Sequence, residues 1–356
     1  MNGSIKLKKY EGNPIISPRP ESTWDSGGAF NPAAVKIGNK IYIVYRAITR
    51  DNTSVFGVAV TKDGYTIEER FDEPIYVPRK HFELHPSLRK ISEMLNEEMH
   101  RLKIKLRHIS GGSYSGVEDP RITRIGNRIY MTYVAFNGVE NPRIAFTSIS
   151  VNDFVQGNMN WDEPRVISHP NITDKGGALF PAKVKGKYMF FHRIFPHIWI
   201  DYVKDLSFSN GRFLFGKPHI HIRPHRWDSR KVGVGAPPLE TDFGWLFVYQ
   251  GISGWDPYHQ HLGITPEMVK VHDYYRYKIG VMVLDKKDPE KVIYRSEEPV
   301  LEPDTWYEGP FAYPCGAVIN HDKLFVYYGA GDYHVAVASV DLSEIREAVR
   351  SWEPPN

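Results

Sequence analysis

Two adjacent carboxylates, Glu118 and Asp119, stand directly before Pro120 in the stretch GVEDPRI. The proline lacks a backbone N–H, so it is tolerated at the start of a strand, and we expect the two acids to lie there. A buried carboxylic acid with a raised pKa is the kind of group that serves as general acid when a glycosidic bond is cleaved. Asp-Pro also commonly begins a turn, and the dipeptide alone favours that simpler interpretation.

Cationic or hydrogen-bond-donating side chains lie at the ends of two other predicted strands. Arg46 ends the strand in VYRA, and His192 and Arg193 end the strand in FHRI. Guanidinium groups bind phosphate oxygens in pairs, so these side chains could hold an anion such as phosphate. They could equally form ion pairs with nearby carboxylates, and residue type alone does not separate the two interpretations.

An internal repeat defines the elements that must position these groups. A proline, a short apolar strand, a turn and an aromatic strand recur five times, each time followed by a third strand. The copies begin at Phe30, Glu118, Leu179, Gly235 and Tyr313. Five units of about four short antiparallel strands predict an all-β fold, the five-bladed β-propeller. A double β-sandwich is the less favoured alternative, because it does not explain the fivefold plan.

Further segments complete the predicted architecture as one domain over residues 1–356. The N-terminal KLKKYEGNPIISP could supply the closing strand of the last blade, and DLSEIREAVRSW near the C-terminus predicts a short closing helix. Between blades one and two lies an insertion, about residues 81–115. Apolar residues at steps of three and four over 86–105 predict an amphipathic helix there. This helix could cover the propeller flank, or serve as a lid or subunit contact, so a homo-oligomer is possible.

Composition excludes several classes of protein. The 356 residues are 41% hydrophobic and 13% aromatic and carry a formal charge of +3, which excludes disorder and argues against a nucleic-acid partner. One cysteine, no signal-like apolar stretch and no membrane span predict a soluble cytoplasmic protein without a membrane partner. His219, His221 and His225 alternate in HIHIRPH, but no acid or cysteine lies at ligand spacing, so we expect no metal. The chain has no nucleotide-binding motif either.

The chain resembles glycoside hydrolase family 130 in a series of motifs that occur in the order of that family. They are FNPAAV, VYRA, GVEDPRI, FHRI, GAPPLETDFGWLFVYQG, and YPCGAV followed by VYYGAGD. This family comprises mannoside phosphorylases and related β-mannosidases on a five-bladed propeller, and the likeness runs from about Asn13 to Asp341. It implies that Asp119 is the single catalytic acid, which protonates the glycosidic oxygen by way of the mannose 3-hydroxyl. Inorganic phosphate, a co-substrate, would attack from the opposite face, so that a β-mannoside gives α-mannose 1-phosphate with inversion and without a cofactor.

The resemblance also guides the prediction of binding residues. The predicted phosphate site comprises Arg46, Lys175, His192, Arg193 and Gln250. The predicted mannoside site comprises Asn31, Glu118, Arg121, Glu240, Tyr249, Tyr313 and Asp332. Further aromatic residues could stack on sugar faces in the leaving-group subsites, although core packing is the simpler interpretation for any one of them. They are Tyr249, Trp255, Tyr258, Tyr274, Tyr275 and Trp306.

Two departures from the family pattern bear on the type of reaction. Many family phosphorylases have YHG where residues 249–251 read YQG, and Pro-Ile-Lys where residues 238–240 read PLE. A glutamine carries no charge, and a glutamate would repel phosphate but could activate water in a hydrolase. Because Arg46 and Arg193 remain, we predict phosphorolysis. An inverting hydrolase and a mannosyltransferase are the alternatives, and the retained Asp119 argues against a sugar-binding propeller without catalysis.

Overall fold

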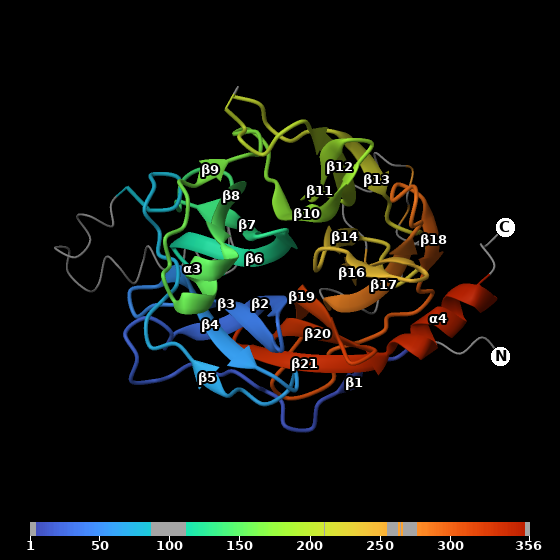
Figure 1. Ribbon diagram of the computed structural model, residues 1–356, viewed down its shortest axis with the longest axis horizontal. Coiled ribbons are helices and arrows are strands. Elements are labelled where there is room, and N and C mark those ends of the chain that lie inside the picture. Colours follow the sequence, from blue (N-terminus) through green and yellow to red (C-terminus); the bar gives the residue numbers. More distant parts are fainter. Residues whose placement is uncertain are drawn as a thin grey trace.

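The computed structural model describes residues 5–86, 112–209, 211–254, 263, 265 and 276–352. Its strands form five antiparallel blades around a common centre, as the repeat predicts (Figure 1). The innermost strands of blades one to five are β2 (Gly28–Ile37), β6 (Ser115–Ile125), β10 (Lys175–Val184), β14 (Lys231–Val234) and β19 (Ala312–Asn320). The short strand β15 (Leu239–Thr241) continues the inner strand of blade four, because it pairs with the same neighbour as β14.

Each blade then adds strands outward. The second strands are β3 (Lys40–Ile48), β7 (Arg128–Phe136), β11 (Lys187–Ile194), β16 (Gly244–Ile252) and β20 (Lys323–Ala330). The third strands are β4 (Thr53–Thr61), β8 (Arg143–Ser150), β12 (His197–Val203), β17 (Lys278–Leu284) and β21 (His334–Asp341). The outermost strands are β5 (Glu69–Arg70), β9 (Arg165–Val166), β13 (Lys217–Ile220), β18 (Val292–Arg295) and β1 (Lys8–Lys9).

The two ends of the chain meet in blade five, as predicted. Strand β1 pairs antiparallel with β21, with Lys8 opposite Ser339, so the first strand of the chain completes the last blade. The helix α4 (Leu342–Ser351) follows β21 and buries Leu342 and Ile345 against the same blade, which confirms the closing helix. The predicted helical insertion lies almost entirely outside the described residues. The other described helix, α3 (Val151–Gln156), begins at Ser150, whose hydroxyl accepts from the Asp153 N–H.

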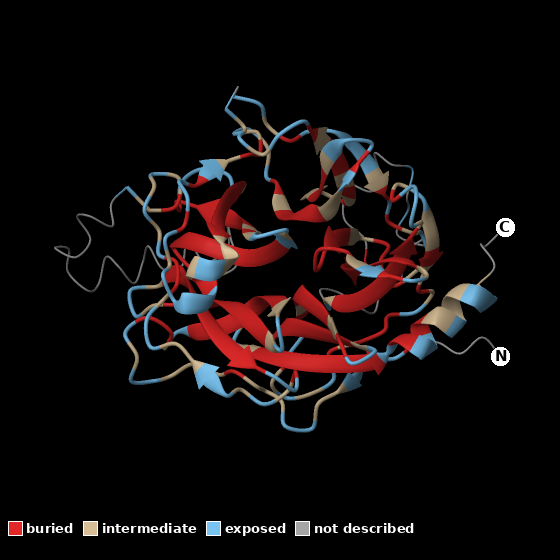
Figure 2. Ribbon diagram, in the orientation of Figure 1, coloured by how far each residue is buried: buried red, intermediate tan, exposed pale blue. Residues whose placement is uncertain are grey.

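The hydrophobic core is divided into five clusters, one between each pair of neighbouring blades. Val44 of blade one packs with Met131 of blade two, for example, and Phe191 of blade three packs with Phe247 of blade four. Figure 2 shows that the inner and middle strands are mostly buried, whereas the outermost strands are more exposed. The strands around the centre are therefore held from both sides, which gives side chains on them fixed positions. None of the helices in the described ranges is long and apolar enough to cross a membrane.

Candidate active site

The centre of the site is a contact between the same position of two neighbouring blades. Asn31 precedes the repeated proline in β2, and Asp119 precedes it in β6. Both residues have left-handed backbone conformations, with φ of +47° and +50°, and both interrupt the strand register. The Asn31 amide Nδ2 donates to Asp119 Oδ1 over 2.8 Å. Gly329 fits beside this contact because a Cβ there would lie 1.9 Å from Asn31 Oδ1.

The Arg46 guanidinium forms ion pairs and hydrogen bonds with the acids and hydroxyls around it. Its guanidinium lies 3.4 Å from Asp119 Oδ1 and 3.1 Å from Glu118 Oε1. Its Nε donates to Ser54 Oγ over 2.9 Å, and its Nη2 donates to Ser113 Oγ over 3.0 Å. The side chain is almost completely buried. Of the two interpretations that the sequence left open for Arg46, this geometry matches the ion pair with the carboxylates.

The pKa values in this group differ from the simple expectation for Asp119. Burial opposes ionisation of Asp119, but the charges of Arg46, Lys175 and Arg121 outweigh burial and hold its pKa below the usual range. The GVEDPRI motif suggested a raised pKa for Asp119, and that expectation is wrong. The acid with the raised pKa is Asp332, where burial and the nearby Asp119 carboxylate raise the pKa to about 6. As the pH falls, Asp332 is therefore protonated before Asp119.

A cluster of cations lies on the blade three and blade four side of the site. Lys175 begins β10 opposite Arg193 of β11, and Lys231 begins β14. Burial, together with the charges of Arg193, Lys175 and Arg230, lowers the pKa of Lys231 well below its usual value. Lys175 is paired with Glu118 at 3.6 Å, whereas the charged form of Lys231 would be favoured by a bound anion. Arg193 Nε also has no hydrogen-bond partner within the described ranges, so the cluster has donor capacity for such an anion.

Two tyrosines connect the cations to the acids. The Lys231 Nζ lies 2.7 Å from the Tyr277 hydroxyl, and the ring of Tyr277 lies 5.6 Å from that of Tyr313. Burial raises the pKa of Tyr277 to about 12, with a further contribution from Asp332. Burial likewise raises the pKa of Tyr313, and the Asp119 charge adds to this. Both phenols are therefore neutral donors at neutral pH, suited to sugar hydroxyls or phosphate oxygens.

Lys231, Arg230 and Tyr277 are site residues that the sequence analysis missed. A signal for the first two was present, because TWDSGGAF before β2 and RWDSRKVG before β14 are copies of one motif. In the second copy Arg230 and Lys231 replace Gly27 and Gly28. An arginine and a lysine at a position where another blade has glycines mark a function specific to blade four. Tyr277 follows residues 266–275, which lie outside the described ranges, and no repeat position points to it.

Arg121 reaches the site, but its guanidinium donates hydrogen bonds to backbone carbonyls. Its three guanidinium nitrogens donate to the carbonyls of Gly235, Asp119 and Val234 over 2.7, 3.0 and 2.7 Å. The side chain therefore links blade two to blade four across the centre. This geometry indicates that Arg121 holds the inner strands at a fixed separation, with its charge next to the Asp119 carboxylate.

Two of the predicted binding residues, Tyr249 and His192, belong to a structural pair that recurs in all five blades. In each blade, an aromatic side chain near the end of the second strand contacts a buried carboxylate that precedes the inner strand. The pairs are Tyr45 with Asp25, Tyr133 with Glu83, His192 with Asp174, Tyr249 with Asp228, and Tyr328 with Glu308. The Tyr249 hydroxyl donates to Asp228 over 2.9 Å, in the core between blades three and four.

This pattern changes the interpretation of both residues. Side chains alternate along a strand, so His192 lies on the face of β11 opposite to Arg193, and Tyr249 lies opposite to Gln250. His192 Nδ1 is 2.9 Å from Asp174 Oδ2, and both side chains are buried. The structure thus brings Arg193 to the cations, pairs His192 with buried Asp174, and places Tyr249 in the core between blades three and four. Gln250 is buried, and its Oε1 has no hydrogen-bond partner in the described part of the chain.

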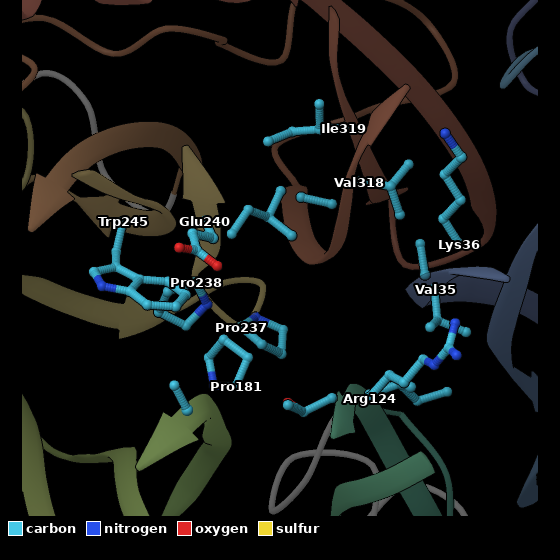
Figure 3. A pocket seen from close by; sticks show the side chains of 16 residues that line it. Val35, Lys36, Arg124, Pro181, Pro237, Pro238, Glu240, Trp245, Val318 and Ile319 are labelled. Carbon is cyan, nitrogen blue, oxygen red and sulfur yellow. The ribbon is translucent and has the colours of Figure 1, made fainter. Parts of the chain in front are cut away.

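Glu240 lies at the opposite end of the central channel from Asp119. It lines a pocket of about 450 Å³ together with Val35, Lys36 and Arg124. Figure 3 shows its carboxylate beside Trp245 and Pro238, with Arg124 across the pocket. Arg124 follows Asp119 by five residues along β6, which corresponds to about 16 Å at the rise of a strand. Glu240 was predicted to bind the mannoside, and the structure does not bring it together with Asp119.

Comparisons with known proteins agree with this geometry. A family model described as β-1,4-mannooligosaccharide phosphorylase matches residues 84–351. The β-1,2-mannobiose phosphorylase of Thermoanaerobacter sp. (strain X514) is 32% identical to the chain, with 96% of this chain and 99% of the relative covered. The 1,2-β-oligomannan phosphorylase of the same organism is 29% identical with the same coverage. A solved structure of β-1,2-mannobiose phosphorylase from Listeria innocua with β-1,2-mannobiose matches with a TM-score of 0.69 and 23% identity, over 97% and 99% of the two chains.

Proposed function

We propose that this chain, which belongs to glycoside hydrolase family 130, cleaves β-mannosides with inorganic phosphate and releases α-mannose 1-phosphate. The observation that carries the proposal is the cation cluster of Lys175, Arg193, Arg230 and Lys231. Burial and the neighbouring cations disfavour the charged form of Lys231, which a bound anion would favour, and phosphate is the anion that the reaction consumes. The relatives that cover nearly the whole chain are phosphorylases by name, which supports the same reaction.

The arrangement suits an in-line displacement with inversion. Phosphate, held by blades three and four, attacks the anomeric carbon of the mannose while the bond to the leaving oxygen breaks on the opposite face. Asp119 gives the leaving oxygen its proton by way of the mannose 3-hydroxyl, as the family resemblance implies. No second carboxylate is needed to activate the nucleophile, because phosphate is already an anion and requires only positioning.

The low pKa of Asp119 in the unliganded site is compatible with its role as acid. The Lys175 charge contributes to that low pKa. When phosphate neutralises the cation cluster, this contribution weakens, and the pKa of Asp119 rises. Phosphate binding therefore favours the protonated form of the acid in the complex that reacts.

We place β-1,2-linked mannosides first among the substrates. Three relatives with this linkage in their names cover 96% of the chain, whereas the Ruminococcus albus relative named for the β-1,4 linkage covers 50%. The linkage itself depends on the shape of the leaving-group subsite.

The experiment is to incubate the protein with β-1,2- and β-1,4-mannobiose, with and without phosphate, and to quantify mannose 1-phosphate and mannose. We expect mannose 1-phosphate from the β-1,2 disaccharide, only in the presence of phosphate. Free mannose alone, at a rate indifferent to phosphate, would show a hydrolase and refute the proposal. A requirement for a nucleotide sugar would show a transferase instead.

A further inference from the structure

A group of exposed aromatic rings borders the turn that carries Asp332. This turn joins β20 to β21, and it points the Asp332 side chain into the buried acid group. The next residue, Tyr333, is 46% exposed, and Trp306, in the loop before β19, is 83% exposed. Both rings meet the ring of His334 nearly at right angles, at centroid distances of 4.9 Å for Tyr333 and 6.2 Å for Trp306.

The backbone around this group is fixed by contacts on both sides. The Tyr333 carbonyl accepts from the Ala29 N–H of blade one over 3.0 Å, and His334 Nδ1 lies 3.0 Å from the Ser17 hydroxyl. Burial lowers the pKa of His334, so its ring is neutral at neutral pH. The three rings therefore form an uncharged, preorganised surface that requires little ordering when a ligand binds.

Core packing does not account for Trp306. A side chain that is 83% exposed removes little apolar surface from water, and its ring meets those of Tyr307 and His334 edge-on. Exposed aromatic rings offer rigid apolar faces and edge donors, which suit the apolar face and the hydroxyls of a pyranose. Tyr333 directly follows Asp332 in the same turn, so the group borders the proposed mannose site.

The position of the rings also matches the direction in which a substrate chain must leave. The cations come from blades three and four, whereas Trp306, Tyr333 and His334 come from blade five. An in-line attack by phosphate places the leaving sugar on the side away from the cations. We propose that Trp306, Tyr333 and His334 form a platform that binds mannosyl units of the leaving portion, so that the enzyme favours oligomannosides over mannobiose. This inference rests on the proposed phosphorolysis.

The test compares chain lengths in the intact protein. Initial rates of mannose 1-phosphate release would be measured at saturating phosphate with β-1,2-linked mannobiose, mannotriose and mannotetraose, for the unmodified protein and for Trp306→Ala, Tyr333→Ala and Trp306→Phe. We expect Trp306→Ala to lower kcat/KM for the longer substrates by about three- to tenfold, the strength of an aromatic contact, and for mannobiose by less than about twofold. Trp306→Phe should retain most of the preference.

Phe215→Ala is the matched control, because Phe215 is 54% exposed and lies in the outer part of blade three. It should leave every rate unchanged. Equal losses for all chain lengths in Trp306→Ala and Tyr333→Ala, or no loss, would overturn the platform. Thermal melting identifies a variant that has lost its fold. If the unmodified protein makes no mannose 1-phosphate from any mannoside, the proposed function fails rather than the platform.

Discussion

The same five inner strands line both ends of the central channel, yet the two ends differ in chemistry. At one end, Asp119 and Arg46 are buried together beside Asp332, with the cations of blades three and four next to them. At the other end, the pocket of Figure 3 is lined mainly by alanine, proline and aliphatic residues, with its charged side chains partly or fully exposed. Only the first end concentrates charge away from water, where electrostatic interactions are strong.

The difference originates in the proline positions of the repeat. At Asn31 and Asp119 the left-handed backbone interrupts the alternation of side chains, so that two consecutive acids, Glu118 and Asp119, can both contact Arg46. Beyond the proline, regular alternation resumes, and the strand presents small residues such as Ala34 to the channel. A local backbone irregularity therefore separates a reactive end from a passive one within a single strand.

The strongest test of the difference between the two ends is to remove the acid from the reactive end. Asp119→Asn keeps an oxygen that can accept from Asn31 but cannot supply a proton. We expect turnover with mannobiose and phosphate to fall by about a hundred- to ten-thousandfold, the usual contribution of general acid catalysis. Product formation measures turnover, and a thermal melt shows whether the variant is folded. Unchanged turnover in a folded variant would remove Asp119 from its role.

The next largest effect should come from the cation cluster. Lys231→Met keeps the length of the side chain and removes its charge, so we expect KM for phosphate to rise about ten- to a hundredfold, as for a lost charge-assisted hydrogen bond. KM for the mannoside should change much less. Lys36→Met, at the passive end, is the matched control and should change neither value. Equal changes in both Michaelis constants for Lys231→Met would contradict a phosphate contact.

The raised pKa of Asp332 predicts a pH-dependent difference in stability. Between about pH 4 and pH 6 the folded protein keeps a proton on Asp332 that the unfolded chain has lost, so this residue lowers the free energy of unfolding as pH rises. Asp332→Asn lacks this penalty. It should be more stable than the unmodified protein by about 2 to 3 kcal/mol at pH 7, from about 1.4 kcal/mol per pKa unit. Denaturant unfolding at pH 4 and pH 7 measures the difference, which should nearly vanish at pH 4.

How much of the fold and site could be predicted from the sequence depends on whether the fivefold repeat or the two-residue alternation of a strand places each residue. The fivefold repeat predicts all five blades and their closure by β1, because a blade cannot bury its faces alone. The repeat also predicts that Asn31, Asp119 and Arg46 meet. It does not show that His192 and Tyr249 lie outside the site. Each is next to a residue that faces the site, and neighbouring residues of one motif lie on opposite faces of a strand.

Other site residues could not be predicted from the sequence for a different reason. Tyr277 and Lys231 contact each other through the fold and have no pattern that connects them in the sequence. Glu240 was predicted from a family motif whose residues were expected to lie close together in space. The inner strand of blade four, however, runs the length of the channel from Lys231 to Glu240, so the motif extends from one end to the other.

A smaller effect is expected where a predicted binding residue proved to be part of the recurring structural pair. Tyr249→Phe removes a hydroxyl that donates to buried Asp228, which keeps its contacts with Arg223 and Arg295. The free energy of unfolding should fall by about 1 kcal/mol, the net value of one hydrogen bond. Steady-state kinetics with mannobiose and phosphate should stay unchanged. A raised KM for the mannoside without loss of stability would return Tyr249 to the substrate site.

The smallest effect is predicted at the passive end, and it separates the two reaction types. Glu240→Gln removes a charge that is paired with Lys286 at 3.4 Å and largely exposed, so both the stability and the rates should change little. If the glutamate were the base of a hydrolase, the same substitution would abolish release of free mannose. Rates with phosphate and in its absence therefore test the distance argument directly. A large loss in either would mean that the channel connects its two ends during the reaction.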